Sequence, residues 1–206
     1  MRCCKIIAVY FGARKQYSDG DEIIELLKYT LANERRVDPG IPMDVVFVNN
    51  SGENYKPGYD YLNSIQGEEV FNGHVGVIHR ENIGISFGAY NAAFEVLAGE
   101  YDYWCFVEDD YIITYHNYFK IAIEQLEANH KLGFVALQGT NRTSPKHAHG
   151  GIGIVKNSTL QLVYDKFGRL PHSRTGGERT KESWSRHIKK GEVAFTACYK
   201  DLGLKL

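Results

Sequence analysis

The sequence predicts an α/β fold: a single domain made of three layers, with a mostly parallel central sheet and helices on both of its faces. Strand-like and helix-like segments alternate over most of the first 140 residues. The strand-like segments are short, apolar and rich in β-branched residues, which is typical of parallel strands buried on both faces. A parallel sheet with helices packed on either side accommodates this alternation most simply. The length of 206 residues suits one domain.

Five segments in this part of the chain are expected to be strands: residues 5–11, 43–50, 73–80, 101–107 and 132–139. Helices are expected over residues 21–34, 86–100 and 116–130, where apolar side chains recur at three- and four-residue steps. Asp19 or Asp21 can cap the first helix, and Gly99 can end the second one. Residues 51–69 are rich in turn formers and predict a loop with one short helix.

The chain changes character after the fifth expected strand. Residues 140–158 and 169–183 are polar and contain several glycines, so both are expected to be loops that are long enough to carry function. Residues 183–191 predict a short helix, and residues 192–199, EVAFTACY, predict a final strand.

Charge and hydropathy exclude two classes of partner. The net charge is -1, with no excess of lysine and arginine that would indicate a nucleic-acid surface. No apolar run reaches the ~20 residues that cross a bilayer. The opening MRCCKIIAVYFG has a short apolar stretch but no small-residue cleavage site, so it predicts a strand rather than a signal peptide.

The four cysteines indicate reduced structural thiols rather than a metal site. Cys3, Cys4, Cys105 and Cys198 contain no C-x-x-C pair, and no H-E-x-x-H motif is present. Cys105 falls inside an aromatic strand, where a thiol behaves as a small apolar group. This pattern favours a cytoplasmic location.

Polar residues follow four of the expected strands. They are Tyr10-Phe11-Gly12, Asn49-Asn50-Ser51, His79-Arg80-Glu81-Asn82 and Glu108-Asp109-Asp110. Ligands of open α/β sheets bind at the carboxyl ends of the strands, so these groups are expected to share one edge. The first group offers an aromatic ring, the second amides and a hydroxyl that could read a base, the third cationic donors, and the fourth carboxylates.

Three consecutive acids at residues 108–110 favour a divalent metal held against a phosphorylated ligand. Adjacent carboxylates repel one another unless a cation or hydrogen-bond donors offset the charge. Oxygen ligands in an open arrangement suit Mg²⁺ or Mn²⁺. The alternative is a solvated strand-to-loop turn that caps the next element.

Two further segments carry candidate chemistry, each with a plainer alternative. Residues 81–95, ENIGISFGAYNAAFE, place glycines at a strand-to-helix junction, where the backbone can approach an anion. The spacing matches neither a dinucleotide fingerprint nor a P-loop, and a tight turn with a packing glycine explains it equally well. In residues 175–192, Glu178 or Glu182 could act as a general base, or either could be a solvated loop acid.

Together these segments resemble the nucleotide-diphospho-sugar glycosyltransferases of the GT-A fold, in particular the large inverting family that includes bacterial rhamnosyl- and glucosyltransferases. The resemblance runs from residue 5 to residue 191. It includes an N-x-G-x-x-x-G-x-x-N segment from Asn82 to Asn91, and a D-x-D-like motif in which Glu108 replaces the first aspartate. Asn49-Asn50-Ser51 stands where the family has D-D-x-S, which is a departure.

The resemblance implies a set of site residues. Asp110 and Asp109 would bind Mn²⁺ or Mg²⁺, and Glu178 or Glu182 would be the catalytic base. The residues implied to contact the nucleotide-sugar are Tyr10, Phe11, Asn49, Arg80, Asn82, Ser86, Gly88, Glu108, Asp109, Gly150 and Gly151. The single domain, residues 1–206, would divide into a nucleotide-binding half (1–115) and an acceptor and catalytic half (116–206).

The implied reaction moves a sugar from a nucleotide-diphospho-sugar, such as a UDP-sugar, to a hydroxyl of a carbohydrate or other acceptor, with inversion. Three alternatives stay open: a retaining transferase, a sugar-phosphate nucleotidyltransferase and a non-catalytic nucleotide-sugar-binding domain. A nucleotidyltransferase should have a glycine-rich loop with a basic end after the first strand, and FGARKQYSDG matches this poorly. A homo-oligomer and a place in a longer protein both stay open.

Overall fold

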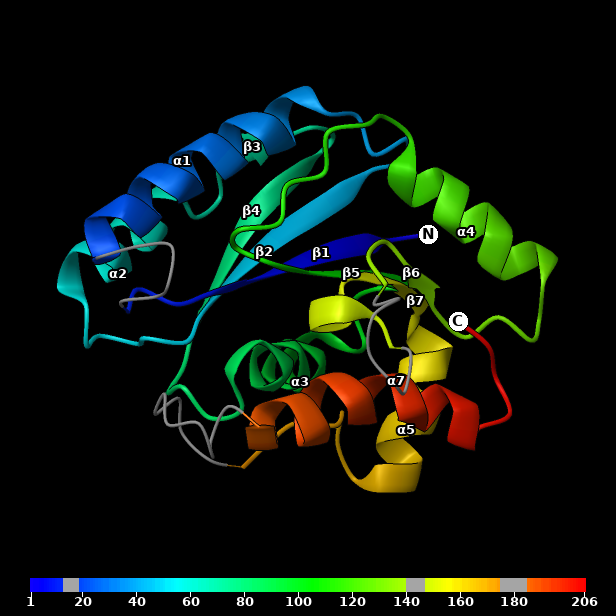
Figure 1. Cartoon of the computed structure of the whole chain (residues 1–206). Helices are drawn as coiled ribbons and strands as arrows, with labels where there is room; N and C mark the ends of the chain where they lie inside the picture. Colours follow the sequence, from blue (N-terminus) through cyan, green and yellow to red (C-terminus); the bar gives the residue numbers. More distant parts are fainter. Residues whose placement is uncertain (13–18, 140–146, 175–184) are drawn as a thin grey trace.

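A twisted seven-stranded sheet forms the centre of the described structure, a computed structural model that covers residues 1–12, 19–139, 147–174 and 185–206 (Figure 1). The strands are β1 (Cys3–Val9), β2 (Met43–Asn49), β3 (Glu69–Val70), β4 (Gly73–His79), β5 (Tyr103–Glu108), β6 (Val135–Ala136) and β7 (Gly153–Lys156). Their order is β3-β4-β2-β1-β5-β7-β6. The four central strands, β4, β2, β1 and β5, run parallel, whereas β3, β7 and β6 pair antiparallel at the two edges.

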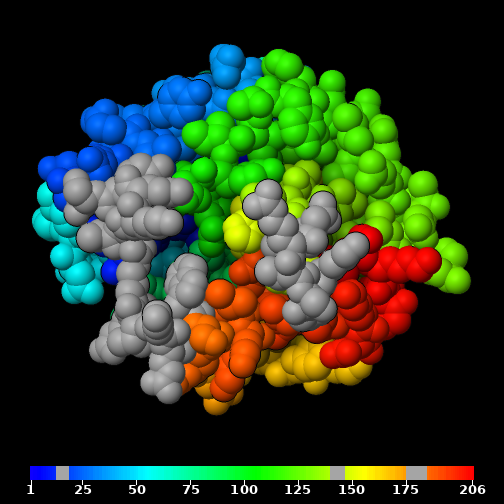
Figure 2. Space-filling view, viewed as in Figure 1, coloured from blue at the N-terminus to red at the C-terminus, as the bar shows by residue number. Residues whose placement is uncertain are grey.

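Helices cover both faces of this sheet, as predicted. They are α1 (Gly20–Arg36), α2 (Lys56–Ile65), α3 (Ile85–Leu97), α4 (Tyr118–Ala128), α5 (Asn157–Phe167), the 3₁₀ turn η1 (His149–Gly151), the π-helix η2 (Ile188–Val193) and α7 (Ala194–Asp201). Helices α1, α2 and α4 lie on one side, and α3, α5 and α7 lie on the other (Figure 1). In the space-filling view, the blue residues of α1 and the green residues of α4 lie above, and the orange and red residues of η2 and α7 lie below (Figure 2).

The central strand β1 explains why this part of the sequence is apolar without alternation. All seven of its residues are buried. Successive side chains of a strand point to opposite faces. Ile7 and Val9 accordingly join the core under α1 and α4, while Ile6 and Ala8 join the core over α3. A strand covered on both faces needs apolar residues at both sets of positions, which confirms the predicted fold class.

The structure corrects the prediction in the last third of the chain. The expected strand 192–199 is helical, because Phe195, Cys198 and Tyr199 recur at helical spacing and are buried on one face. Strand β7 lies within residues 140–158, which were expected to be a loop. Helix α5 begins in the same segment and continues through residues that the sequence did not assign, and the fifth expected strand contributes only β6. β7, which pairs antiparallel with β5, has only four residues, and such a short segment shows no clear period in its hydrophobic residues.

A buried ion pair joins β1 to α1. The Lys5 ammonium is 1% exposed and lies 2.5 Å from the carboxylate of Glu34, which is 5% exposed. The ammonium also lies 5.3 Å from the ring centroid of Tyr118, which begins α4. Because both charges are removed from water, neither can lose its partner without a large penalty.

Within the part of the chain that the structure describes, no helix combines the length and the apolarity needed to cross a bilayer.

We expect Glu34→Gln to lower the free energy of unfolding by about 3–5 kcal/mol, because Lys5 would keep a buried charge without a counter-ion. The double variant Lys5→Met/Glu34→Leu should recover most of that loss, since it removes both charges. Urea denaturation monitored by circular dichroism measures both values. The matched control is Glu25→Gln, which breaks an exposed pair with Lys28 and should change little. Equal effects of Glu34→Gln and Glu25→Gln would show that burial does not govern the pair.

The folded protein should react very slowly with a thiol reagent such as dithiobis(nitrobenzoate). Burial raises the pKa of Cys3, Cys105 and Cys198 to about 12 and also raises the pKa of Cys4 well above its usual value, so almost no thiolate exists near neutral pH. In denaturant all 4 cysteines should react quickly. Rapid labelling of the folded protein would contradict this account.

Candidate functional site

The carboxyl ends of the four parallel strands meet at one edge of the sheet, as the sequence predicted. Val9 of β1 is in register with Asn49 of β2, which is in register with His79 of β4. On the other side of β1, Ala8 is in register with Glu108 of β5. The polar groups that follow these strands are therefore neighbours in space.

Buried hydrogen bonds tie these strand ends together. Asp109 is 1% exposed, and its Oδ2 accepts a hydrogen bond of 3.1 Å from the backbone N–H of Tyr10. The N–H of Phe11 donates to Ser51 Oγ at 2.9 Å. A carboxylate that accepts backbone N–H groups is stabilised in a buried position. The turn after β1 is thus held from both neighbouring strands.

Asn49 and His79 form the next part of this network. Asn49 Oδ1 accepts from the N–H of Ser51 at 2.8 Å, so its Nδ2 must be the donor toward Gly52 O (2.9 Å) and His79 Nδ1 (3.0 Å). His79 Nδ1 is then an acceptor, and Nε2–H donates to Asn63 Oδ1 at 3.1 Å. Burial lowers the pKa of His79, which agrees with this neutral tautomer.

The side chain of Asn49 is therefore already engaged within the protein. Reading a nucleotide base would require one of these bonds to open, and the predicted contact stays a prediction. Tyr10 is half-buried and lies at the edge, whereas the ring of Phe11 is buried and stacks on Tyr55 with centroids 5.5 Å apart.

Arg80 extends the edge with a cation. Its guanidinium donates to Asn50 Oδ1, and to Ile83 O at 2.7 Å. Burial lowers its pKa, while Glu95 and Glu81 act in the opposite direction. Five N–H donors belong to a guanidinium, so these contacts leave capacity for a ligand.

The glycine motif at residues 82–91 has packing reasons in this structure. Gly84 has φ +84°, and a Cβ there would lie 2.6 Å from Ser173 O. A Cβ on Gly88 would lie 1.9 Å from Ile83 O, so only glycine fits. Asn91 Oδ1 accepts from the N–H of Leu170 at 2.8 Å. These residues build the junction between β4 and α3 and fasten a later segment to it.

Glu108 lies beside the glycine turn at residues 150–151. Its Oε1 accepts from Ser86 Oγ at 2.6 Å, and a Cβ on Gly150 would lie 3.2 Å from its Oε2. Gly150 and Gly151 have φ of +59° and +66°, which favours glycine. Tyr90 Oη donates to Gly150 O at 3.2 Å. Ser86, Glu108 and the turn at Gly150 and Gly151 therefore lie side by side, and their contact with a nucleotide-sugar stays a prediction.

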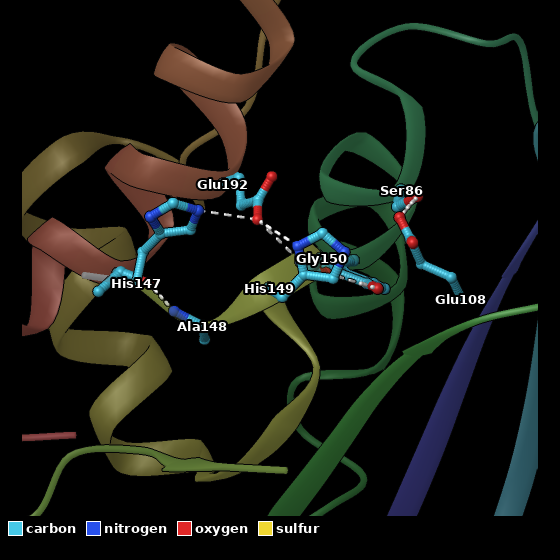
Figure 3. Close-up of polar contacts among 9 residues, drawn as sticks. Ser86, Glu108, His147, Ala148, His149, Gly150 and Glu192 are labelled. Atoms are coloured by element: carbon cyan, nitrogen blue, oxygen red, sulfur yellow. Dashed lines mark hydrogen bonds and ion pairs between the residues drawn. The ribbon is translucent and has the colours of Figure 1, made fainter. Parts of the chain in front are cut away.

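A second cluster, which the sequence did not predict, supports the turn from the other side (Figure 3). Glu192 Oε1 accepts from His147 Nε2 (2.9 Å), His149 Nδ1 (3.0 Å) and the N–H of Gly150 (3.3 Å). The pairs are separated by 42 to 45 residues in the chain. The polar segment H-A-H-G-G was the only available signal, and its partner lay in the segment expected to be a strand.

A preformed metal cage is absent from residues 1–12, 19–139, 147–174 and 185–206: no three His, Cys, Asp or Glu side chains there are placed to hold an ion. Asp109 and Glu108 each accept a bond from the protein, and Asp110 is exposed. The residues present do not fit a dedicated Mn²⁺ or Mg²⁺ site, and the D-x-D-like metal motif is not supported.

Several expectations fall outside these sites. Glu178 and Glu182 belong to residues 175–184, outside the described residues, and their role as base stays a prediction. The division into a nucleotide-binding and a catalytic half also stays a prediction.

A mainly apolar cavity of about 760 Å³ lies beside β6 and is lined in part by Phe134, Thr196 and Leu204. None of the described residues that line it belongs to the strand-end edge.

No protein-family model matches the sequence, and no curated protein matches it. The fold is similar to that of a cytidylyltransferase from Leptospira borgpetersenii serovar Hardjo-bovis (strain JB197), with a TM-score of 0.50 and 15% sequence identity. The similarity covers 81% of this chain and 64% of the cytidylyltransferase chain, which is less than two thirds of that protein's length. At this identity the similarity establishes the fold alone.

This finding corrects the family resemblance. The similar structure is a nucleotidyltransferase, not a glycosyltransferase, so the expected GT-A glycosyltransferase of the hexosyltransferase class is wrong. The motifs that suggested the glycosyltransferase family have structural roles in this fold, which explains why they are present. Gly84 and Gly88 are required by close backbone contacts, and Glu108 and Asn91 are held by bonds within the protein. Such features belong to the packing of the sheet and specify no sugar chemistry.

We expect the free energy of unfolding to fall as the pH is lowered from 7.5 to 5.5. The ordinary histidine pKa is 6.5, and the folded protein lowers it at His79 and at His172. As the pH falls through 6.5, these histidines bind protons more readily in the unfolded chain than in the folded protein, so acid favours unfolding. The effect ends below the lowered pKa values of His79 and His172 in the folded protein. Urea denaturation at each pH measures the slope.

His79→Gln should reduce that slope without removing it, because His172 still contributes. The matched control is His130→Gln, at an exposed position after α4, which should leave the slope unchanged. A slope in His79→Gln as steep as in the natural sequence would refute the assigned neutral tautomer.

Proposed function

We propose that this chain is a nucleotide-binding transferase of the nucleotidyltransferase class. The observation that carries the proposal is the polar network at the boundary between β1 and β5. From β1 the chain proceeds to β2 and then β4 on one side, and later crosses to β5 on the other side of β1. Ligands of open α/β sheets bind at such a switch point, outside the carboxyl ends of the strands.

The residues at this boundary are pre-organised for binding. The turn at Tyr10 and Phe11 is fixed by Asp109 and Ser51, so a nucleotide would meet backbone that needs little further ordering. Arg80 brings a cation to the same edge. The similarity in fold to a cytidylyltransferase supports this class over sugar transfer.

In the proposed reaction an acceptor oxygen attacks the α-phosphorus of a nucleoside triphosphate. The new oxygen–phosphorus bond forms as the bond between the α-phosphorus and its bridging oxygen breaks, and pyrophosphate leaves. Phosphoryl-type transfer depends chiefly on positioning and on neutralising negative charge. The chain's part is to hold the nucleotide at the β1 turn and to place Arg80 against its phosphates.

A divalent ion bound with the triphosphate would neutralise further charge, and Mg²⁺ needs only one or two protein carboxylates when phosphates supply other ligands. Asp110 is the exposed carboxylate at the end of β5 that fits this smaller requirement. The sequence also places Arg14 and Lys15 soon after Gly12, although the glycine-rich run expected of a nucleotidyltransferase is missing there.

A nucleoside triphosphate should raise the melting temperature of the protein in the presence of Mg²⁺, because a ligand that binds only the folded state stabilises it by mass action. The stabilisation is ~2.7 kcal/mol at a ligand concentration of 100 times Kd. A panel of the four common triphosphates, scanned by differential fluorimetry, identifies the base. Pyrophosphate release with a panel of phosphorylated and hydroxyl acceptors then tests transfer.

Asp110→Asn should reduce pyrophosphate release on the order of a hundredfold, because an amide would hold the divalent ion that accompanies the triphosphate less well than a carboxylate, and charge on the leaving pyrophosphate would be less well neutralised. Asp165→Asn, an exposed change on α5, is the matched control and should leave release unchanged. Binding without release would favour a non-catalytic nucleotide-binding domain. The absence of any nucleotide-dependent shift would refute the proposal.

A further inference from the structure

A second concave site lies between the end of α5, the segment that follows it, and the helices η2 and α7. The cavity has a volume of about 410 Å³, and the described residues that line it lie between Phe167 and Asp201. Helices α5 and α7 lie side by side on the lower face of the sheet (Figure 1). None of the residues that line it belongs to the strand-end edge. We call it the basic cavity, after the four side chains Arg169, His172, Lys189 and Lys190 in its wall.

The charges in the basic cavity are unbalanced. Asp201 is the one acidic residue among the described residues that line it. Among the described residues, no carboxylate forms an ion pair with Arg169, Lys189 or Lys190. The pKa of Arg169 is lowered by its burial and by the nearby cation Arg174. A concave surface lined by one sign of charge concentrates its field and attracts ions of the opposite sign.

His172 adds a group that can respond to an anion. Its Nδ1–H donates to Leu170 O at 2.8 Å, which leaves Nε2 as the other polar atom of the ring. Burial is the largest cause of the lowered pKa of His172, and the nearby cations Arg169 and Arg80 lower this pKa further. The hydrogen bond to Leu170 and the charge of Glu95 act in the opposite direction. Glu95 accepts a hydrogen bond from Tyr164. A bound anion would offset the repulsion from the two arginines and favour the protonated ring.

The remaining wall is apolar, which suits the body of a small molecule. Phe167 and Pro171 contribute from one side, and the small side chains of Ala194 and Ala197 contribute from α7. Cys198 also lines the wall, with its thiol donating to Phe195 O. Ligand sites typically measure 300–1,000 Å³ and combine apolar walls with a few polar groups.

We propose that the basic cavity is a binding site for a small molecule that carries a phosphate group on an apolar or ring-shaped body. The phosphate would be held by Arg169 and the lysines Lys189 and Lys190, and the body would pack against Phe167 and Pro171. The site is additional to the proposed nucleotide site and does not depend on it. Arginine and lysine both bind phosphate, arginine through paired N–H donors and lysine as a point charge.

The test uses phenyl phosphate as the probe, with phenol and inorganic phosphate as its two halves, in isothermal titration calorimetry of the full chain without nucleotide. Phenyl phosphate should bind more tightly than either half. Lys189→Gln/Lys190→Gln should weaken the binding of phenyl phosphate by about tenfold or more. Each lysine can donate a charge-assisted hydrogen bond to the phosphate, and losing such bonds lowers the affinity by this order. Both lysines are exposed, so the variant should fold, and circular dichroism verifies this.

Two controls make the outcome decisive. Lys120→Gln/Lys131→Gln removes the same charge from exposed positions elsewhere and should leave the affinity unchanged. Arg80→Gln changes the strand-end edge and, because Arg80 acts on His172 only at a distance, should weaken binding much less than the Lys189/Lys190 variant does. If Arg80→Gln abolishes binding while the Lys189/Lys190 variant retains it, the phosphate binds at the strand ends and the proposal is overturned. Equal weakening by both lysine pairs, or no binding by the natural sequence, overturns it too.

The result is independent of the nucleotide proposal. Triphosphate binding at the strand ends is measured separately, with Mg²⁺, and its failure would leave phenyl phosphate binding at Lys189 and Lys190 intact. Conversely, the Lys189→Gln/Lys190→Gln variant should lose phenyl phosphate binding and still show the full triphosphate-dependent rise in melting temperature.

Discussion

The bond between the buried carboxylate of Asp109 and the backbone N–H of Tyr10 is the constraint on which the strand-end edge depends. A carboxyl group that is 1% exposed is stable only when hydrogen-bond partners surround it, and the turn after β1 supplies one of them. The same turn is fixed from the opposite side, where Phe11 N–H donates to Ser51. β1 is the central strand of the parallel core, so holding its end from both neighbours fixes the edge as one unit. A binding surface built in this way loses little entropy when a ligand arrives.

That constraint also divides the three consecutive acids by role. Asp109 faces inward and holds the turn, Glu108 accepts from Ser86 beside the turn at Gly150, and Asp110 alone is exposed. The crowded negative charge that first indicated a metal cage is thus distributed over three surroundings. The carboxylates of Asp109 and Glu108 bond to the architecture of the edge, and Asp110 is the one of these three acids that is exposed.

The sequence predicted the parallel core well because its signal is local. A strand such as β1, buried on both faces, must be apolar throughout, and the amphipathic spacing of α1 follows from one covered face. Elements formed by long-range packing were missed. β7 has four residues and depends on pairing with β5, and the helical state of residues 194–201 depends on Phe195 packing against Phe134 and Phe106. The cluster around Glu192 joins groups 42 to 45 residues apart, so no local pattern could reveal it.

The same distinction explains how a family motif can be matched in residues while its chemistry is absent. Gly88 must be glycine because α3 starts against the carbonyl of Ile83, and Gly84 must be glycine because its backbone is left-handed beside Ser173. Any α/β protein that turns from a parallel strand into a closely packed helix meets these demands, whatever it binds. The spacing of such glycines therefore reports the geometry of the junction. Function has to be argued from the polar groups at the strand ends, among them the half-buried Arg80 after β4 and the exposed Asp110 after β5.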